Sequence, residues 1–123
     1  MPVSRRNSIL DPANRARIAV DTADDNQASD ILMLDLQGIC DFADYFVLMN
    51  ADSSRQINTL VDQIEAALKL QGVRPHHREG TADSGWVLLD FIDVIVHIFR
   101  PEEREYYQLE DAWTGATETV RIQ

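Results

Sequence analysis

The sequence predicts one α/β domain in which helices flank a mixed β-sheet. Its 123 residues are the usual length of a single domain, and 45% hydrophobic with 26% charged residues is an ordinary globular composition. Short apolar runs rich in β-branched residues alternate with segments of helical periodicity. The expected order is a helix, two strands, a helix, an optional short strand, two strands and a final helix.

The first predicted helix begins at Asp11, because Asp followed by Pro12 is a typical N-cap and first-turn pair. The small apolar residues that recur at helical spacing behind it are Ala16, Ala19, Val20 and Ala23. Residues 1–10 show no periodicity and are expected to form a flexible leader. The folded domain should occupy residues 11–113, and a frayed tail should follow over residues 114–123.

Two strands and a second helix should come next. The apolar run at residues 30–36 ends at a glycine, and residues 45–49 have the aromatic and β-branched content of another strand. Ser53 and Gln56 fit the capping box that opens a helix. The apolar face of this helix comprises Ile57, Leu60, Val61, Ile64 and Leu68. Gly72 is expected to end it.

The second half of the chain predicts a hairpin and a final helix. Residues 73–77 lead into a turn-rich loop, after which residues 86–89 and 94–99 form two β-rich runs separated by a brief acidic connection. This pattern favours an antiparallel hairpin. Arg100 and Pro101 then end the strand and open the helix. The first-turn carboxylates that complement its dipole are Glu102, Glu103 and Glu105.

The net charge of −10 is unevenly distributed. The first twenty residues carry four Arg and one Asp, whereas the remaining residues carry seven basic and twenty acidic side chains. An acidic body repels phosphate backbones and anionic lipid, and it attracts basic protein surfaces. We therefore expect a basic protein partner, no direct sequence-specific binding to nucleic acid and no membrane association.

Neither a membrane segment nor a disulfide is expected. The most apolar stretch, residues 86–99, is too short to span a bilayer and is interrupted by Asp90, Asp93 and His97. Cys40 is the single cysteine, so it closes no intrachain disulfide and completes no zinc pattern, and we interpret it as a buried small hydrophobic residue. This cysteine usage fits a reducing compartment, and we expect a cytoplasmic location.

Two metal-binding arrangements were considered and neither is favoured. The histidines could share a metal with Asp90 or Asp93, but His76 and His77 are adjacent and would point to opposite faces of an extended segment. Asp90 and Asp93 could instead hold magnesium in a nucleotidyl or phosphoryl transferase, although no glycine-rich phosphate loop accompanies them and Asp commonly ends tight turns. We expect no catalytic residue, metal or cofactor, and we keep the magnesium-dependent transferase as the alternative.

Aromatic side chains set among charged ones indicate a protein interface near the carboxyl end. Tyr106, Leu109 and Trp113 recur at spacings of three and four, which predicts that they seat the final helix on the core. Tyr107 lies off this stripe and Trp86 follows a glycine-containing loop. These two are therefore the better interface candidates.

Several sequence blocks between residues 28 and 113 carry a family resemblance. They are DILMLDLQGICDFADYFVLM, SSRQ at the start of the second helix, EG ahead of WVLLD, DVIVHIF and RPEEREYYQLEDAW. In content, order and spacing they resemble the Iojap family, also called the ribosomal silencing factor family. Residues 11–113 are accordingly expected to form an Iojap-like domain.

The resemblance implies an α/β fold similar to that of nucleotidyltransferases but without their catalysis. It also implies docking on the large ribosomal subunit, through the ribosomal protein numbered fourteen, at the face that meets the small subunit. Occupancy would obstruct subunit joining and repress translation when nutrients are scarce, and homodimers are associated with the family. The partner-binding residues that match the family's motifs are Trp86 and Tyr107 first, then Asp93, Arg100, Glu102 and Tyr106.

Overall fold

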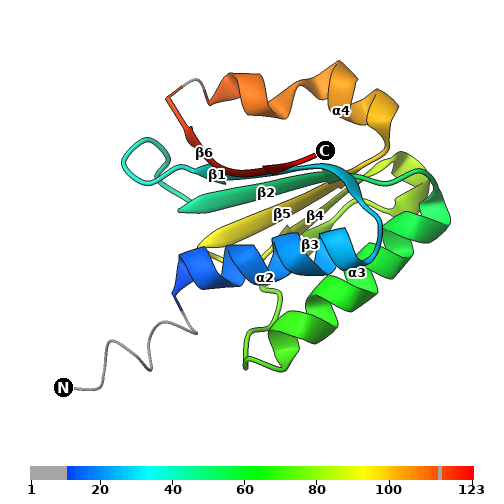
Figure 1. Cartoon of the computed structure of the whole chain (residues 1–123), viewed down its shortest axis with the longest axis horizontal. Helices are drawn as coiled ribbons and strands as arrows, with labels where there is room; N and C mark the ends of the chain where they lie inside the picture. Colours follow the sequence, from blue (N-terminus) through cyan, green and yellow to red (C-terminus); the bar gives the residue numbers. More distant parts are fainter. Residues whose placement is uncertain (1–10, 114) are drawn as a thin grey trace.

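One mixed six-stranded sheet organises the chain, which the computed structural model describes over residues 11–113 and 115–123 (Figure 1). The strands are β1 (Ser29–Asp35), β2 (Tyr45–Asn50), β3 (His77–Glu79), β4 (Trp86–Asp90), β5 (Val94–Phe99) and β6 (Thr117–Ile122). The helices are α2 (Pro12–Asp25), α3 (Ser54–Lys69) and α4 (Pro101–Tyr107), with short 3₁₀ helices η1 (Ala82–Ser84) and η2 (Leu109–Ala112). The spatial order is β3–β4–β5–β2–β1–β6; β2 and β5 pair in parallel and the other neighbours are antiparallel.

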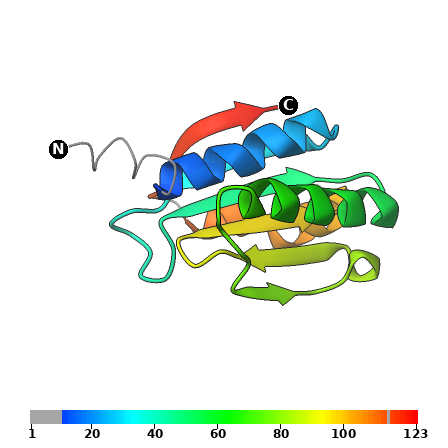
Figure 2. The same cartoon turned by 90° about the horizontal axis from the view of Figure 1, so that it is seen from below.

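The helices form a layer on each face of the sheet. α2 and α3 cover one face, and α4 with η2 covers the other (Figure 1, Figure 2). Every residue of the two central strands, β2 and β5, is buried, which explains why both read as continuous apolar runs. The predicted α/β fold with a mixed, helix-flanked sheet is confirmed.

Local signals place α2 and α3 where the sequence predicts them. The Asp11 side chain accepts a hydrogen bond from the Ala13 backbone N–H and caps α2. Ser53 Oγ accepts from the Gln56 backbone N–H at 3.1 Å and caps α3. The Gln56 side chain accepts from the Asp52 backbone N–H, one residue earlier than a capping box requires, at 2.6 Å. Gly72, with φ of +79°, ends the turn after α3.

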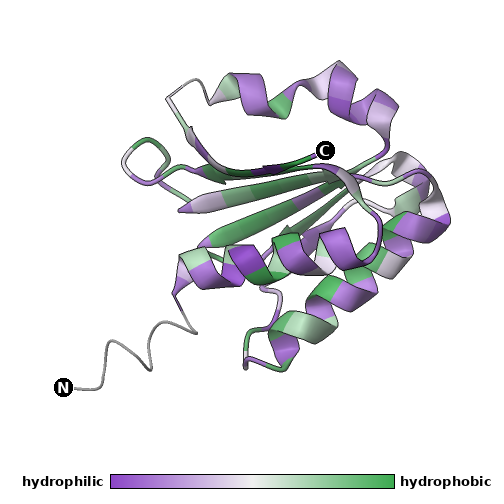
Figure 3. Cartoon of the chain, viewed as in Figure 1, coloured by the Kyte–Doolittle hydropathy of each residue, from purple (hydrophilic) through white to green (hydrophobic). Residues whose placement is uncertain are grey.

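The core is divided by the sheet into two clusters. The larger lies against α2 and α3, whose apolar faces are green in Figure 3 while their outward faces are purple. Small residues such as Ala16 and Ala19 are fully buried, which lets α2 approach the sheet closely. The smaller cluster lies beneath α4 and η2 and includes Phe46 and Phe99. Cys40 packs at its edge and is half-buried, so the prediction of a buried cysteine is only partly right.

The predicted hairpin is β4 and β5, which pair antiparallel with Trp86 opposite Phe99. The optional strand forms at residues 77–79 as β3, which pairs with β4 and is exposed along its length. None of the helices in the described ranges is long and apolar enough to cross a membrane. The predicted leader, residues 1–10, lies outside the described residues.

The prediction of a frayed tail after Trp113 is wrong. Residues 117–122 form β6, an edge strand paired antiparallel with β1. Val120 and Ile122 pack against the larger core cluster, while Thr119 and Arg121, which alternate with them, are exposed. This alternation fixes the strand on the sheet edge.

The final helix is shorter than its apolar spacing predicts. α4 ends at Tyr107 because Gln108 adopts a left-handed conformation with φ of +46°, and η2 follows in a new direction. Leu109 and Trp113 therefore pack on the smaller core cluster, but Tyr106 is 81% exposed. Its predicted role in seating the helix on the core is wrong.

Candidate functional site

Trp86 and Tyr107 lie side by side on the α4 face of the sheet, with ring centroids 4.7 Å apart. Trp86 begins β4 opposite the last residue of β5, and α4 continues directly from β5, so the topology brings the two rings together. The Trp86 ring also stacks on buried Phe99 at 4.9 Å. Trp86 is half-buried and Tyr107 is 51% exposed. Each ring is thus held in place by packing and remains partly accessible to solvent.

A small cavity of about 280 Å³ opens beside this pair. Its lining comprises Trp86, Leu88, Tyr107, Glu79, Gly80 and Ser84. Tyr106 packs edge-on against Tyr107 with centroids 5.0 Å apart and extends the apolar area outward. We call Trp86, Leu88, Tyr106 and Tyr107 the aromatic surface. An apolar floor with a carboxylate at its rim is the arrangement found at protein interfaces.

The loop before β4 holds Trp86 in place. Thr81 and Ser84 cap η1 reciprocally, each side chain accepting from the other's backbone N–H, and Ser84 Oγ lies 3.2 Å from the Trp86 carbonyl oxygen. Gly80 has φ of +83°, and a β-carbon there would collide with the Trp86 carbonyl oxygen. Only glycine can adopt this positive φ without strain and also avoid the collision, because it has no β-carbon.

We predict that Gly80→Ala lowers the free energy of unfolding by about 2–3 kcal/mol, because it combines left-handed strain with a backbone collision. Gly72→Ala is the matched control, since Gly72 has a similar φ of +79° and no atom within 4 Å of an added β-carbon. The control should lose only about 1 kcal/mol. Urea denaturation measures both values, and equal losses would show that the contact with Trp86 is unimportant.

His97 lies beneath the aromatic surface and is 3% exposed. Its Nδ1 accepts a hydrogen bond from Trp86 Nε1–H at 3.2 Å, whereas Nε2 is buried without a hydrogen-bond partner among the described residues. Burial disfavours the imidazolium, and repulsion from Arg104 adds to this, so the pKa of His97 falls from 6.5 to about 3. The ring is neutral at physiological pH.

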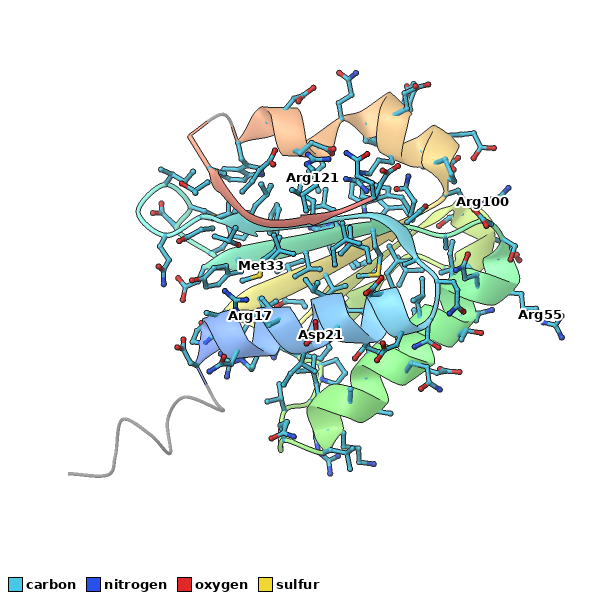
Figure 4. All side chains as sticks on the ribbon, in the orientation of Figure 1. Arg17, Asp21, Met33, Arg55, Arg100 and Arg121 are labelled. Carbon is cyan, nitrogen blue, oxygen red and sulfur yellow. The ribbon has the colours of Figure 1, made fainter. Side chains whose placement is uncertain are left out.

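Five of the six predicted contact residues lie at one end of the sheet. Arg100 sits where β5 passes into α4, near the right-hand edge of the molecule in Figure 4, and its Nη2 is 4.0 Å from Glu102 Oε2. Tyr106 follows on the same helix. Asp93 precedes β5 at the opposite end, about 20 Å along the strand from Phe99, and pairs with Arg15 of α2 at 2.7 Å. The structure therefore does not group Asp93 with the others.

The residues of the two metal hypotheses serve local structure. Asp90 Oδ1 accepts from the Ile92 backbone N–H at 2.7 Å and shapes the β4–β5 turn, while Asp93 holds Arg15. His76 and His77 lie exposed at the β3 edge, away from buried His97. Within residues 11–113 and 115–123, no three His, Cys, Asp or Glu side chains group as metal ligands.

Sequence reasoning missed Arg104, a charged residue that is 8% exposed on the inner side of α4. Nη1 donates to the Asp30 carbonyl oxygen at 2.7 Å and to Asn50 Oδ1 at 2.9 Å, and Nε lies 3.2 Å from Glu110 Oε2. This one side chain links α4 to β1, β2 and η2, and it thereby positions Tyr107. The one sequence feature that could have indicated its role is its position between Arg100 and Tyr107, two predicted contact residues.

Comparison with known proteins identifies relatives along nearly the whole chain. Residues 10–123 match the family model described as "Ribosomal silencing factor during starvation". A ribosomal silencing factor from Bacillus subtilis (strain 168) is 39% identical over 100 residues, which cover 81% of this chain and 85% of that protein. A Mus musculus protein named "Mitochondrial assembly of ribosomal large subunit protein 1" is 31% identical over 90 residues, which cover 71% of this chain and 40% of that protein.

The fold has a close match among solved structures. A crystal structure of a Chromobacterium violaceum protein aligns with a TM-score of 0.81 and 29% sequence identity, covering 89% of this chain and 93% of that one. A match of this coverage includes most of the described chain.

Proposed function

Because this chain belongs to the ribosomal silencing factor family, we propose that it binds the large ribosomal subunit and blocks its association with the small subunit. The contact is with the basic ribosomal protein numbered fourteen, and the result is repression of translation under nutrient limitation. The mechanism is steric: the bound domain occupies space that the small subunit needs, and no bond is broken. The protein acts in the cytoplasm, and it forms homodimers when free.

The observation that carries this proposal is the aromatic surface, in which Trp86 and Tyr107 contact each other yet remain accessible. Partly exposed rings on a rigid base can become fully desolvated against a partner, and such rings supply most of the binding energy at protein interfaces. Glu79 at the cavity rim and Glu102 on α4 place negative charge beside them. This charge favours a basic partner.

Ribosomal RNA near the contact would repel the acidic domain, so the orientation of its charge matters. The outward sides of α2 and α3 carry exposed carboxylates, including Asp21, which is labelled in Figure 4, and Asp62. These helices cover the face of the sheet opposite α4. Docking through the aromatic surface would turn these carboxylates away from the subunit, while the carboxylates of α4 and η2 lie on the docking side and would face the basic partner protein.

We predict that Trp86→Ala and Tyr107→Ala each weaken co-sedimentation with purified large subunits by about 10- to 100-fold, as expected for hot-spot aromatics. Circular dichroism should show that both variants remain folded. Leu70→Ala is the matched control, because Leu70 is an 86% exposed apolar residue at the end of α3, and it should bind like the wild type. Higher salt should weaken binding.

A second readout tests the mechanism. Addition of the wild-type protein to separated subunits should reduce the yield of joined ribosomes on a sucrose gradient. Addition of the Tyr107→Ala variant in its place should leave this yield close to that without any added protein. If both ring variants co-sediment with large subunits as tightly as the wild type, the aromatic surface is not the contact.

A further inference from the structure

We propose that His97 is a positioning residue, which fixes the orientation of the Trp86 indole for docking at a cost in folding stability. The inference rests on the proposed function, because docking is the property that the orientation serves. The role follows from the packing and hydrogen bonding around the imidazole.

His97 and Trp86 are diagonal neighbours on one face of the β4–β5 hairpin, since Trp86 pairs with Phe99 and Leu88 pairs with His97. The indole stacks on Phe99 at a centroid distance of 4.9 Å, and it lies tilted against Tyr107 at 4.7 Å. Stacking restrains the plane of the ring but does not select between its two flipped orientations, because the Trp χ2 torsion is broad and roughly two-fold. The hydrogen bond from Trp86 Nε1–H to His97 Nδ1, at 3.2 Å, is directional and selects one of them.

This bond requires a particular form of the histidine. Nδ1 must be unprotonated to accept, so the neutral ring carries its proton on Nε2. Nε2 is buried and meets no hydrogen-bond partner in the described part of the chain. An unsatisfied buried donor is destabilising, and an apolar side chain of similar size would avoid the penalty. The unpaired Nε2–H thus offsets what the bond from Trp86 adds to folding stability, so folding alone gives histidine little advantage here, whereas the orientation of Trp86 favours it.

The surroundings keep the ring in its accepting form. Phe46 and Phe99 contact it at centroid distances of 4.7 and 6.1 Å, and Arg104 is the charged group that acts on it. Both desolvation and the positive charge of Arg104 lower the pKa of His97, so the Nδ1 lone pair stays available throughout the physiological range.

The test compares His97→Leu with His97→Gln, whose side-chain carbonyl can still accept from the indole. His97→Leu should have an unchanged or higher Tm, yet bind large subunits about five- to tenfold more weakly, the effect of losing one directional hydrogen bond. His97→Gln should bind within about threefold of the wild type. In a Trp86→Phe background, which has no indole N–H, His97→Leu should change affinity less than about twofold.

The proposal would be overturned if His97→Leu bound large subunits as tightly as the wild type. It would also be overturned if His97→Leu lowered the affinity as much in the Trp86→Phe background as it does in the wild-type background.

Indole ¹H–¹⁵N spectra provide a readout without ribosomes. The Trp86 N–H should be protected from exchange in the wild type and in His97→Gln, and it should lose protection in His97→Leu. Should His97→Leu fail to fold, full protection in a His97→Val variant that does fold would also count against the proposal. Wild-type protein that shows this protection but binds no subunits would refute the proposed function and leave the orienting bond intact.

Discussion

Replacing Arg104 with methionine should lower the free energy of unfolding by about 3 kcal/mol, because the change leaves one buried and two partly buried acceptors unpaired at once. The guanidinium bonds the Asp30 carbonyl oxygen, the Asn50 side chain and Glu110, at distances of 2.7 to 3.2 Å. Methionine fills a similar volume, so the loss reports the polar contacts rather than a cavity. α4 is seven residues long and Arg104 is its one buried residue, so the helix depends on this anchor.

Urea denaturation of the wild type and Arg104→Met measures the difference. Arg121→Met is the control, because Arg121 forms a more exposed pair with Glu118 at 3.1 Å and should cost at most about 1 kcal/mol. Equal losses in the two variants would show that burial adds nothing to the Arg104 network. Arg104→Met should also weaken ribosome binding, since Tyr107 is carried by the helix that Arg104 holds.

Elements with local signals were predictable from the sequence. The caps at Asp11 and Ser53 and the apolar face beginning at Ile57 act within one or two turns, so the chain itself contains the information for α2 and α3. The β4–β5 hairpin was equally accessible, because two β-rich runs with a short connection pair almost unavoidably.

Elements that depend on distant partners were not predictable. β6 is mostly polar, its first three residues are all exposed, and it is a strand because β1 offers it a free edge. Gln108 adopts a left-handed conformation, although glycine and asparagine are the residues typical of it. The apolar periodicity therefore does not indicate the break between α4 and η2.

The candidate site divides in the same way. Trp86 and Tyr107 stood out by residue type and family resemblance, and the fold brings them into contact. His97 and Arg104 act through buried hydrogen bonds, which exist only once β5, α4 and the ends of β1 and β2 are in register. Asp93 matched a family motif, but its carboxylate pairs with α2 at the far end of β5.

Acidification below pH 6.5 should destabilise the wild type more than His97→Gln. The pKa of His97 is about 3 in the fold and near 6.5 in the unfolded chain, so between these values the unfolded state binds a proton that the native state excludes. Stability from this group is thus fully present above pH 6.5 and falls as the pH decreases toward 3. The slope approaches about 1.4 kcal/mol per pH unit.

The comparison is sharpest between pH 7 and pH 5.5, because most carboxylates remain ionised there in both proteins. Over this interval the wild type should lose roughly 1 kcal/mol more than His97→Gln, measured by urea denaturation. His76 and His77 are exposed and present in both proteins, so their contributions cancel. A parallel loss in the two proteins would mean that native His97 takes up its proton over this same interval. A ring protonated at Nδ1 could not accept the Trp86 hydrogen bond on which the aromatic surface depends.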